Sequence, residues 1–159
     1  MNVKYIKPEA FSDYKKPYMF IGTPKCSFKC CIEAGLPISI CQNSEWAKLP
    51  VENTDNQTII KQYLSDPITS AIVFGGMEPM DTFDDMVEFI KEFRQQSLDD
   101  IVIYTGYLPK EVSEKILVLQ RFPNIIVKFG RYIPNREPRY DEVLGITLIS
   151  DNQFSERIS

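Results

Sequence analysis

The stretch Ala71-Ile72-Val73-Phe74-Gly75-Gly76 decides the class of fold more than any other part of the chain. A short, continuous apolar run that ends in glycines is typical of a strand buried on both faces of a sheet. Comparable runs, each followed by turn residues, occur at 18–21, 101–104 and 125–127, with a further candidate at 145–149. The chain therefore contains several strands of the kind found inside parallel sheets.

Helical segments separate these strands. The strongest follows Thr82, where apolar residues recur at helical spacing: Phe83, Met86, Val87, Ile90 and Phe93. Thr82 with Asp85 three residues later predicts an acidic variant of the capping box. A second helix is expected over 55–65, capped by Thr54 or Asp55, and a third from Pro109 to about Gln120. Strands alternating with such helices predict βαβ units with right-handed crossovers and a mainly parallel sheet.

Length and composition restrict the function. The 159 residues predict a single domain over 1–159, and the net charge of −4 argues against a nucleic-acid partner. No apolar run approaches the roughly 18 residues of a membrane-spanning helix, and the first 20 residues lack the apolar core of a signal peptide. We therefore expect a cytoplasmic protein with no membrane partner. The chain has no histidine, which excludes Ser-His-Asp and Cys-His catalysis and histidine-ligated metals.

All four cysteines fall in one irregular loop at about 23–50, at positions 26, 30, 31 and 41. Clustered thiols in a chain without a secretion signal more often bind metal or carry out redox chemistry than form disulfides. The separated C-x2-C pairs of a zinc ribbon are absent. Three thiolates, from Cys26, Cys30 and Cys41, would leave one iron of a [4Fe–4S] cluster open. A structural zinc or iron site that uses all four thiols remains the alternative.

Each unusual segment follows a predicted strand. The cysteine loop follows the first strand, Gly75-Gly76 the second, Thr105-Gly106 the third and Gly130-Arg131 the fourth. Because the carboxyl ends of parallel strands share one edge of a sheet, these segments should meet in space and form a ligand site.

Several segments resemble one family. Cys26-Ser27-Phe28-Lys29-Cys30, followed by Cys41-Gln42-Asn43, is similar to the C-x3-C-x2-C-x-N signature of radical S-adenosylmethionine (SAM) enzymes. Further segments narrow the resemblance to the activating proteins of anaerobic (class III) ribonucleotide reductases: Gly75-Gly76-Met77-Glu78-Pro79, the run from Asp100 to Tyr107, Gly130-Arg131-Tyr132, and Ser150-Asp151-Asn152-Gln153. Together they cover about residues 17–158.

The resemblance implies an α/β fold, namely an abbreviated, open partial (βα) barrel of the radical SAM type. It implies a [4Fe–4S] cluster that cleaves SAM reductively, so that the resulting radical abstracts a glycine Cα hydrogen from the reductase. That protein substrate and a low-potential electron donor, such as flavodoxin or ferredoxin, would be the partners. The implied cluster ligands are Cys26, Cys30 and Cys41, and the implied SAM-binding residues are Ile40, Asn43, Gly75, Gly76, Glu78 and Thr105.

The chain departs from the family pattern at two points. Ten residues, 31–40, separate Cys30 from Cys41, where the signature has two, and Met77 is inserted before Glu78. Cys31 is then a spare thiol or a ligand of a second site. An activator of another glycyl-radical enzyme, a small-molecule radical SAM enzyme and a non-catalytic four-cysteine module are the alternative functions. Because metal binding and local folding are coupled, we expect the loop to be disordered without its metal.

Overall fold

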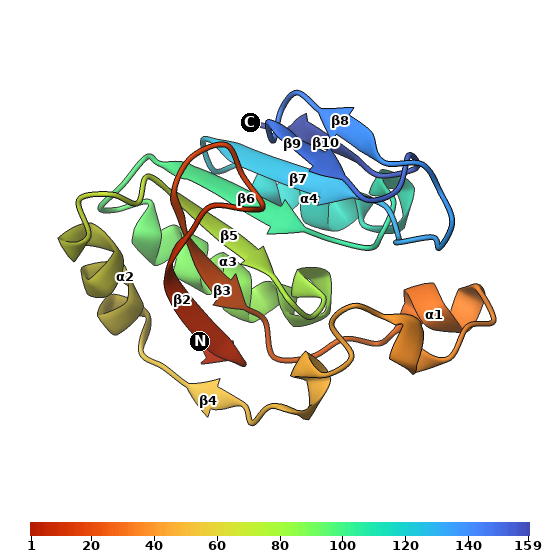
Figure 1. Cartoon of the computed structure of the whole chain (residues 1–159). Coiled ribbons are helices and arrows are strands. Elements are labelled where there is room, and N and C mark those ends of the chain that lie inside the picture. The colour runs from red at the N-terminus through yellow and green to blue at the C-terminus, as the bar shows by residue number, and fades with distance from the viewer.

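The computed structural model describes residues 1–159. The fold contains a central six-stranded sheet with the strand order β10-β7-β6-β5-β3-β2 (Figure 1). The four inner strands are parallel: β3 (Tyr18–Gly22), β5 (Ala71–Gly75), β6 (Asp100–Tyr104) and β7 (Ile125–Phe129). The two edge strands are antiparallel to their neighbours: β2 (Tyr5–Ala10) and β10 (Phe154–Arg157). The inner strands are almost wholly buried, as their continuous apolar sequences predict.

Three helices pack on one face of this sheet. They are α2 (Asn56–Ser65), α3 (Phe83–Phe93) and α4 (Ser113–Leu119). Their buried side chains share one apolar cluster with alternate residues of the strands, among them Ile21, Phe74 and Ile103. Two short antiparallel sheets lie outside the main one: β1 (Asn2–Val3) with β4 (Glu52–Asn53), and β8 (Arg139–Asp141) with β9 (Ile146–Leu148).

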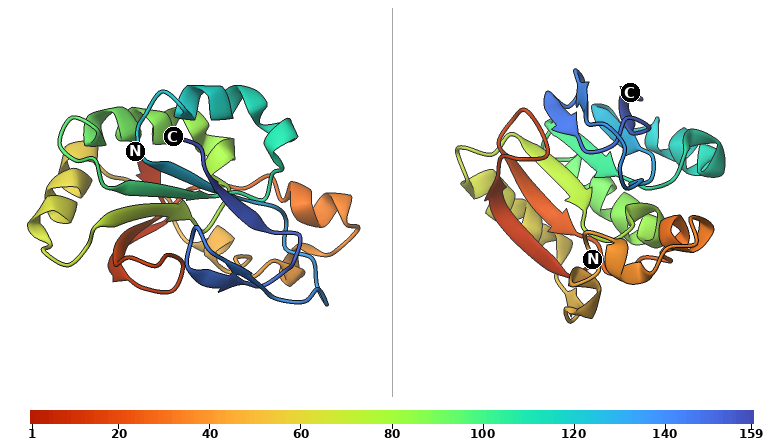
Figure 2. Two further views of the ribbon diagram at one scale, coloured as in Figure 1. Left: turned by 90° about the horizontal axis from the view of Figure 1, so that it is seen from above. Right: turned by 45° about the vertical axis from the view of Figure 1, so that its right-hand side comes forward.

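The opposite face of the sheet is covered differently. Tyr14, Leu144 and Leu148 pack there against the remaining strand residues, such as Val73 and Ile126. The β8–β9 hairpin supplies much of this cover, and Figure 2 shows it on the side of the sheet away from α3 and α4. Both faces of the parallel strands are therefore sealed, one by helices and one by a hairpin and loops.

The fold corrects the predicted class. The sheet is mixed, with antiparallel strands at both edges, and the four helices are short, so the prediction of an abbreviated, open partial (βα) barrel of the radical SAM type is wrong. A barrel of that type continues as parallel βα units, whereas here β2 and β10 pair antiparallel with the parallel strands and end the sheet at both edges. The long connection from β3 to β5 begins with an irregular loop that contains the five-residue α1 (Lys29–Glu33) and reaches α2 only at Asn56. The expected strand at 145–149 is β9, which lies in the hairpin and not in the main sheet.

Most individual elements agree with the sequence, with corrections at the helix starts. Asp55 caps α2, accepting a hydrogen bond from the Thr58 amide at 2.9 Å. Thr82 makes no capping bond, and Asp85 instead accepts one from the Asn2 amide at 2.7 Å. The helix expected over 109–120 is a 3₁₀ turn followed by α4. The other 3₁₀ turns are Ile38–Ile40, Trp46–Lys48 and Pro79–Thr82. None of the helices has the length and apolar character needed to span a membrane.

Candidate iron–sulfur site

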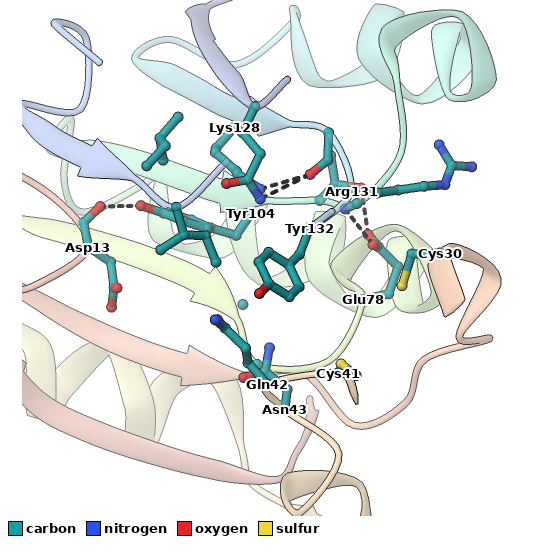
Figure 3. A pocket seen from close by; sticks show the side chains of 18 of the residues that line it. Asp13, Cys30, Cys41, Gln42, Asn43, Glu78, Tyr104, Lys128, Arg131 and Tyr132 are labelled. Carbon is teal, nitrogen blue, oxygen red and sulfur yellow. Dashed lines mark hydrogen bonds between the residues drawn. The ribbon is translucent and has the colours of Figure 1, made fainter. Parts of the chain in front are cut away.

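The loops that follow the four parallel strands enclose one cavity of about 440 Å³ (Figure 3). Eight of the nine residues predicted from sequence to form the site line this cavity. They are Cys30, Ile40, Cys41, Asn43, Gly75, Gly76, Glu78 and Thr105. The exception is Cys26, which lies outside the cavity wall, whereas Cys31 is part of it. The shared edge of the parallel strands thus brings together segments that are up to 101 residues apart along the chain, from Cys30 to Arg131.

The cysteine loop presents free thiols in two environments. Cys26, Cys30 and Cys41 are partly exposed, whereas Cys31 is buried with its sulfur 4.0 Å from that of Cys30. The Phe28 amide donates a hydrogen bond to the Cys26 sulfur at 3.2 Å, and Phe28 itself has left-handed backbone geometry (φ 54°). Burial raises the pKa of the Cys26 thiol to about 12. A coordinated thiol is deprotonated by the metal itself, which overrides this shift.

The cysteine thiols of the loop are chemically suited to bind an iron–sulfur cluster. The loop must close further before the three thiols can reach the same cluster. Cysteine thiolates are the ligands that such clusters take, and an amide hydrogen bond to sulfur is a usual second contact. No three cysteine or carboxylate side chains lie close enough together here to share a metal ion. Between residues 24 and 50 only Cys31 is buried, so drawing the thiols together disturbs little apolar packing.

Glu78 is the most completely hydrogen-bonded group of the cavity wall. Its Oε1 accepts from the Thr105 hydroxyl at 2.7 Å and from the Met80 amide at 3.1 Å, and its Oε2 accepts from the Gly106 amide at 2.9 Å. Burial raises the pKa of Glu78, and these three donors oppose that rise. Thr105 therefore fixes the orientation of Glu78. One acceptor position on Oε2 remains for a ligand.

The glycine pair is explained by its surroundings. Gly76 has φ +78°, and a Cβ there would lie 3.0 Å from the indole ring of Trp46. A Cβ at Gly75 would lie 3.1 Å from the ring of Phe20. The pair lets the chain turn away from β5 between two aromatic rings, which brings Glu78 back to the cavity.

Ion pairs connect α1, which carries Cys30 and Cys31, to the body of the protein. The Arg131 guanidinium holds both oxygens of Glu111, at 2.7 and 2.9 Å, and also contacts Glu33 of α1 at 2.6 Å. Lys29 completes the network with a 2.8 Å bond to Glu111. The hydrogen bonds from Arg131 lower the pKa of Glu111 to about 2. The sequence predicts no specific contact for Arg131, whereas in the structure Arg131 anchors the cysteine loop.

A second anchor holds the loop before α1. Asp81 accepts a hydrogen bond from the Ser27 amide at 2.6 Å and another from the Tyr107 hydroxyl at 2.8 Å. The Tyr107 hydroxyl also lies 3.3 Å from the Ser27 side chain. Ser27 is therefore held by hydrogen bonds to the loops that follow β5 and β6.

Two polar residues of the cavity were missed by the sequence analysis as functional groups. Lys128 is buried on β7, where its Nζ donates to the Gly130 carbonyl at 2.9 Å, and burial lowers its pKa to about 8. Gln153 is also buried, and its Oε1 has no hydrogen-bond partner. The available signal was a lysine inside the otherwise apolar run Ile125–Phe129.

Comparison with known proteins supports an iron–sulfur site at this edge of the sheet. Residues 23–145 match the family model described as a 4Fe-4S single cluster domain. The matched segment contains all four cysteines, Glu78, Thr105 and Arg131. Searches of curated proteins and of solved structures give no match. Because the match to the family model covers most of the chain, this iron–sulfur protein belongs to the 4Fe-4S single cluster domain family.

Proposed function

We propose that the protein is a radical SAM activase that generates a glycyl radical on an anaerobic ribonucleotide reductase. The sequence resemblance to activating proteins suggests this activity, and the family match supports the iron–sulfur part of it. Its protein substrate would be the reductase, and a low-potential flavodoxin or ferredoxin would supply the electron. The proposal does not depend on a barrel fold, because the activity resides in the loops at the edge of the sheet.

One observation carries the proposal. Two of the three proposed cluster ligands, Cys30 and Cys41, line the same cavity as Glu78, Thr105 and the glycine pair. A cavity of about 440 Å³ is within the range of small-molecule sites and is large enough for a nucleoside ligand beside a cluster. Thiol ligands and polar ligand-binding groups in one enclosure are the arrangement that cluster-dependent chemistry on a bound molecule requires.

The residues of this chain hold and orient the reactants. When bound, a cluster with one open iron would supply the single electron that cleaves SAM. Cys26, Cys30 and Cys41 would hold that cluster. Glu78, fixed by Thr105 and Gly106, would bind the amino group of SAM through its free acceptor position. The apolar side chain of Ile40 and the amide of Asn43 also face the cavity and would contact the nucleoside.

Anaerobic reconstitution tests this function. The reconstituted protein should show the broad visible absorbance of a [4Fe–4S] cluster and, with dithionite, should convert SAM to 5′-deoxyadenosine, detected by chromatography. Cys26→Ala, Cys30→Ala and Cys41→Ala should each abolish the product. With the reductase present, electron paramagnetic resonance should detect a glycyl radical. A cluster-loaded protein that never cleaves SAM would refute the proposal.

A different reactivity would point to another protein substrate. If SAM is cleaved but the reductase gains no radical, the protein activates another glycyl-radical enzyme or modifies a small molecule. Exchanging candidate protein substrates in the same assay separates these possibilities.

The arrangement of Cys30 and Cys31 favours one second candidate, a non-catalytic four-thiol metal module. The two sulfurs are 4.0 Å apart and both residues line the cavity, whereas Cys26 does not. In this case Cys31 would be a ligand and no position on the metal would be open. Cys31→Ala would then lose metal, as measured by elemental analysis, and SAM would not bind. Under the activase proposal Cys31→Ala keeps both the cluster and SAM cleavage.

A further inference from the structure

The strand β9 has one edge that no other strand covers. It belongs to a two-stranded sheet and pairs only with β8. Outside that pairing, the backbone of residues 146–149 makes no hydrogen bond to any other backbone group. An uncovered strand edge is a row of free N–H and C=O groups to which another extended chain can pair.

This free edge borders the cavity. All four residues from Ile146 to Ile149 line the cavity wall. Side chains of successive strand residues point to opposite faces, so a cavity that touches four in a row meets the strand along its edge. No residue of β8 lines the cavity, so the edge in question is the one that β8 leaves free.

The composition of this edge differs from that of the other uncovered strands. β2 exposes Lys7, Pro8 and Glu9, and β10 exposes Glu156, which are residues that discourage pairing with a further strand. Residues 146–149 read Ile-Thr-Leu-Ile, without a charge or a proline. They combine high strand propensity with a backbone that nothing protects from pairing. This edge is therefore the one best suited to accept another strand.

Apolar side chains surround the mouth of the cavity beside this edge. Ile40, Tyr132 and Ile149 all line the cavity, yet they are 41%, 36% and 43% exposed. Large apolar groups that are exposed together often mark a binding surface. A polypeptide segment matches both features, because its main chain can pair with the strand edge while its side chains cover the apolar rim.

We propose that the free edge of β9, together with Ile149, binds an extended segment of the protein substrate by strand addition. The inference rests on the proposed function, in which that segment carries the glycine that loses its Cα hydrogen. Glycine has no side chain to grip, so a site that positions it has to hold the main chain around it. Pairing with residues 146–149 holds that main chain at the cavity.

Hydrogen exchange with mass spectrometry tests this contact without any turnover. The anaerobically reconstituted, oxidised full chain is compared alone and with saturating anaerobic ribonucleotide reductase. Amides within residues 146–150 should exchange at least about 10-fold more slowly in the complex, because paired backbone groups are protected. Amides of β2, whose edge is also uncovered, should exchange at the same rate in both samples.

Two variants at Ile149 separate backbone pairing from side-chain contact. The Ile149 amide donates to no other backbone group and its φ is not positive, so Ile149→Pro removes a donor that the fold does not use. Biolayer interferometry should show binding of the reductase weakened by about 10-fold or more, since a hydrogen bond is lost and the ring obstructs the added strand. Ile149→Ala keeps the amide and should weaken binding by only about 3-fold.

The outcomes separate this inference from the proposed function. If the reductase binds but slows exchange elsewhere, or if the two variants lose the same affinity, the inference is wrong and the activase proposal stands. Protection of residues 146–150 that appears without the reductase, as the protein concentration rises, would identify a second copy as the occupant and overturn the inference.

Two remaining results are also decisive. If the reductase does not bind at all, the inference is wrong, and SAM cleavage and the glycyl radical signal judge the proposed function separately. If near-ultraviolet circular dichroism shows that Ile149→Pro is misfolded, the exchange of the wild type decides alone.

Discussion

The sheet body and the cysteine loop are held in place by different kinds of interaction. In the body, every residue of β5 and β7 is buried, and the helices and the hairpin cover both faces. In the loop, Cys31 is the only buried residue between 24 and 50. The loop is attached by polar contacts at a few points, chiefly those of Arg131 and Asp81, and near its end by the Trp46 ring, which packs edge-on against Tyr5 and Phe20.

This difference fits a protein that has to assemble a metal site. Apolar burial is the main source of stability for a fold, so the body keeps its shape whatever the loop does. Polar anchors at the ends of a loop hold it near the cavity and leave its backbone free to close around a cluster. Metal binding can then order the loop without changing the sheet. The following variants test whether the two regions are independent in this way.

The largest effect should come from the body. Phe89 is fully buried on α3, with its ring 5.6 Å from that of Phe74 and 6.0 Å from that of Phe93. Phe89→Ala should lower the free energy of unfolding by about 3–5 kcal/mol, because a large cavity replaces the ring. Urea denaturation followed by circular dichroism measures this change.

The matched variant in the loop is Ile32→Ala. Ile32 is 68% exposed on α1, so the substitution should change the free energy of unfolding by no more than about 0.5 kcal/mol. A cost comparable to that of Phe89→Ala would mean that α1 is part of the core, and the comparison would be wrong.

The next effect is local to the loop. Arg131→Met removes the contacts to Glu111 and Glu33, so α1 loses its main attachment. The free energy of local opening at residues 29–36 should fall by about 1.5–3 kcal/mol, the usual value for charged hydrogen bonds. Hydrogen exchange with mass spectrometry measures it, while the urea midpoint should change little.

Arg136→Met is the control for that experiment. Arg136 forms an exposed pair with Asp151 at 3.2 Å, and such pairs contribute little. Equal exchange in the two variants would show that Arg131 does not hold α1.

The elements that the sequence predicts well are those that it encodes with apolar runs. The inner strands and α3 consist of residues that are buried on both faces or along one stripe, and the pattern is local. The edge strand β2 was missed because it carries Lys7, Pro8 and Glu9 exposed, with no apolar run to mark it. The barrel prediction was wrong because β2 and β10 pair antiparallel with β3 and β7, and neither edge strand carries an apolar run that would reveal it.

For the site, as for the fold, the sequence predicts the features that follow from the strand pattern. The convergence of Cys30, Cys41, Glu78 and Thr105 follows from the topology of parallel strands, which the strand pattern indicates. The anchoring role of Arg131 and the burial of Lys128 depend on side-chain packing across several loops. A single sequence contains no direct record of that packing.

Acid should release the loop before it unfolds the body. The hydrogen bonds from Arg131 and Lys29 hold the pKa of Glu111 at about 2, below its ordinary 4.5. A carboxyl whose pKa is lowered in the folded state stabilises that state above the ordinary value, and this contribution is lost as pH falls from about 4.5 toward 2. Exchange protection at residues 29–36, corrected for intrinsic rates, should therefore decline in that window. Glu111→Gln should remove this pH dependence, and its persistence would assign it to another carboxyl group.

The smallest effect concerns the second anchor. Tyr107→Phe removes the hydroxyl that donates to Asp81 and lies beside Ser27, while Asp81 keeps its bond to the Ser27 amide. One neutral donor lost to a carboxylate at a partly exposed position should reduce local protection around residues 25–28 by about 0.5–1.5 kcal/mol. Tyr140→Phe, in which an exposed hydroxyl without a partner is removed, is the matched control. If the Tyr107 variant also lowered the urea midpoint as Phe89→Ala does, the first turn of the cysteine loop would have to be counted with the body, and only residues beyond α1 would be free to close on a cluster.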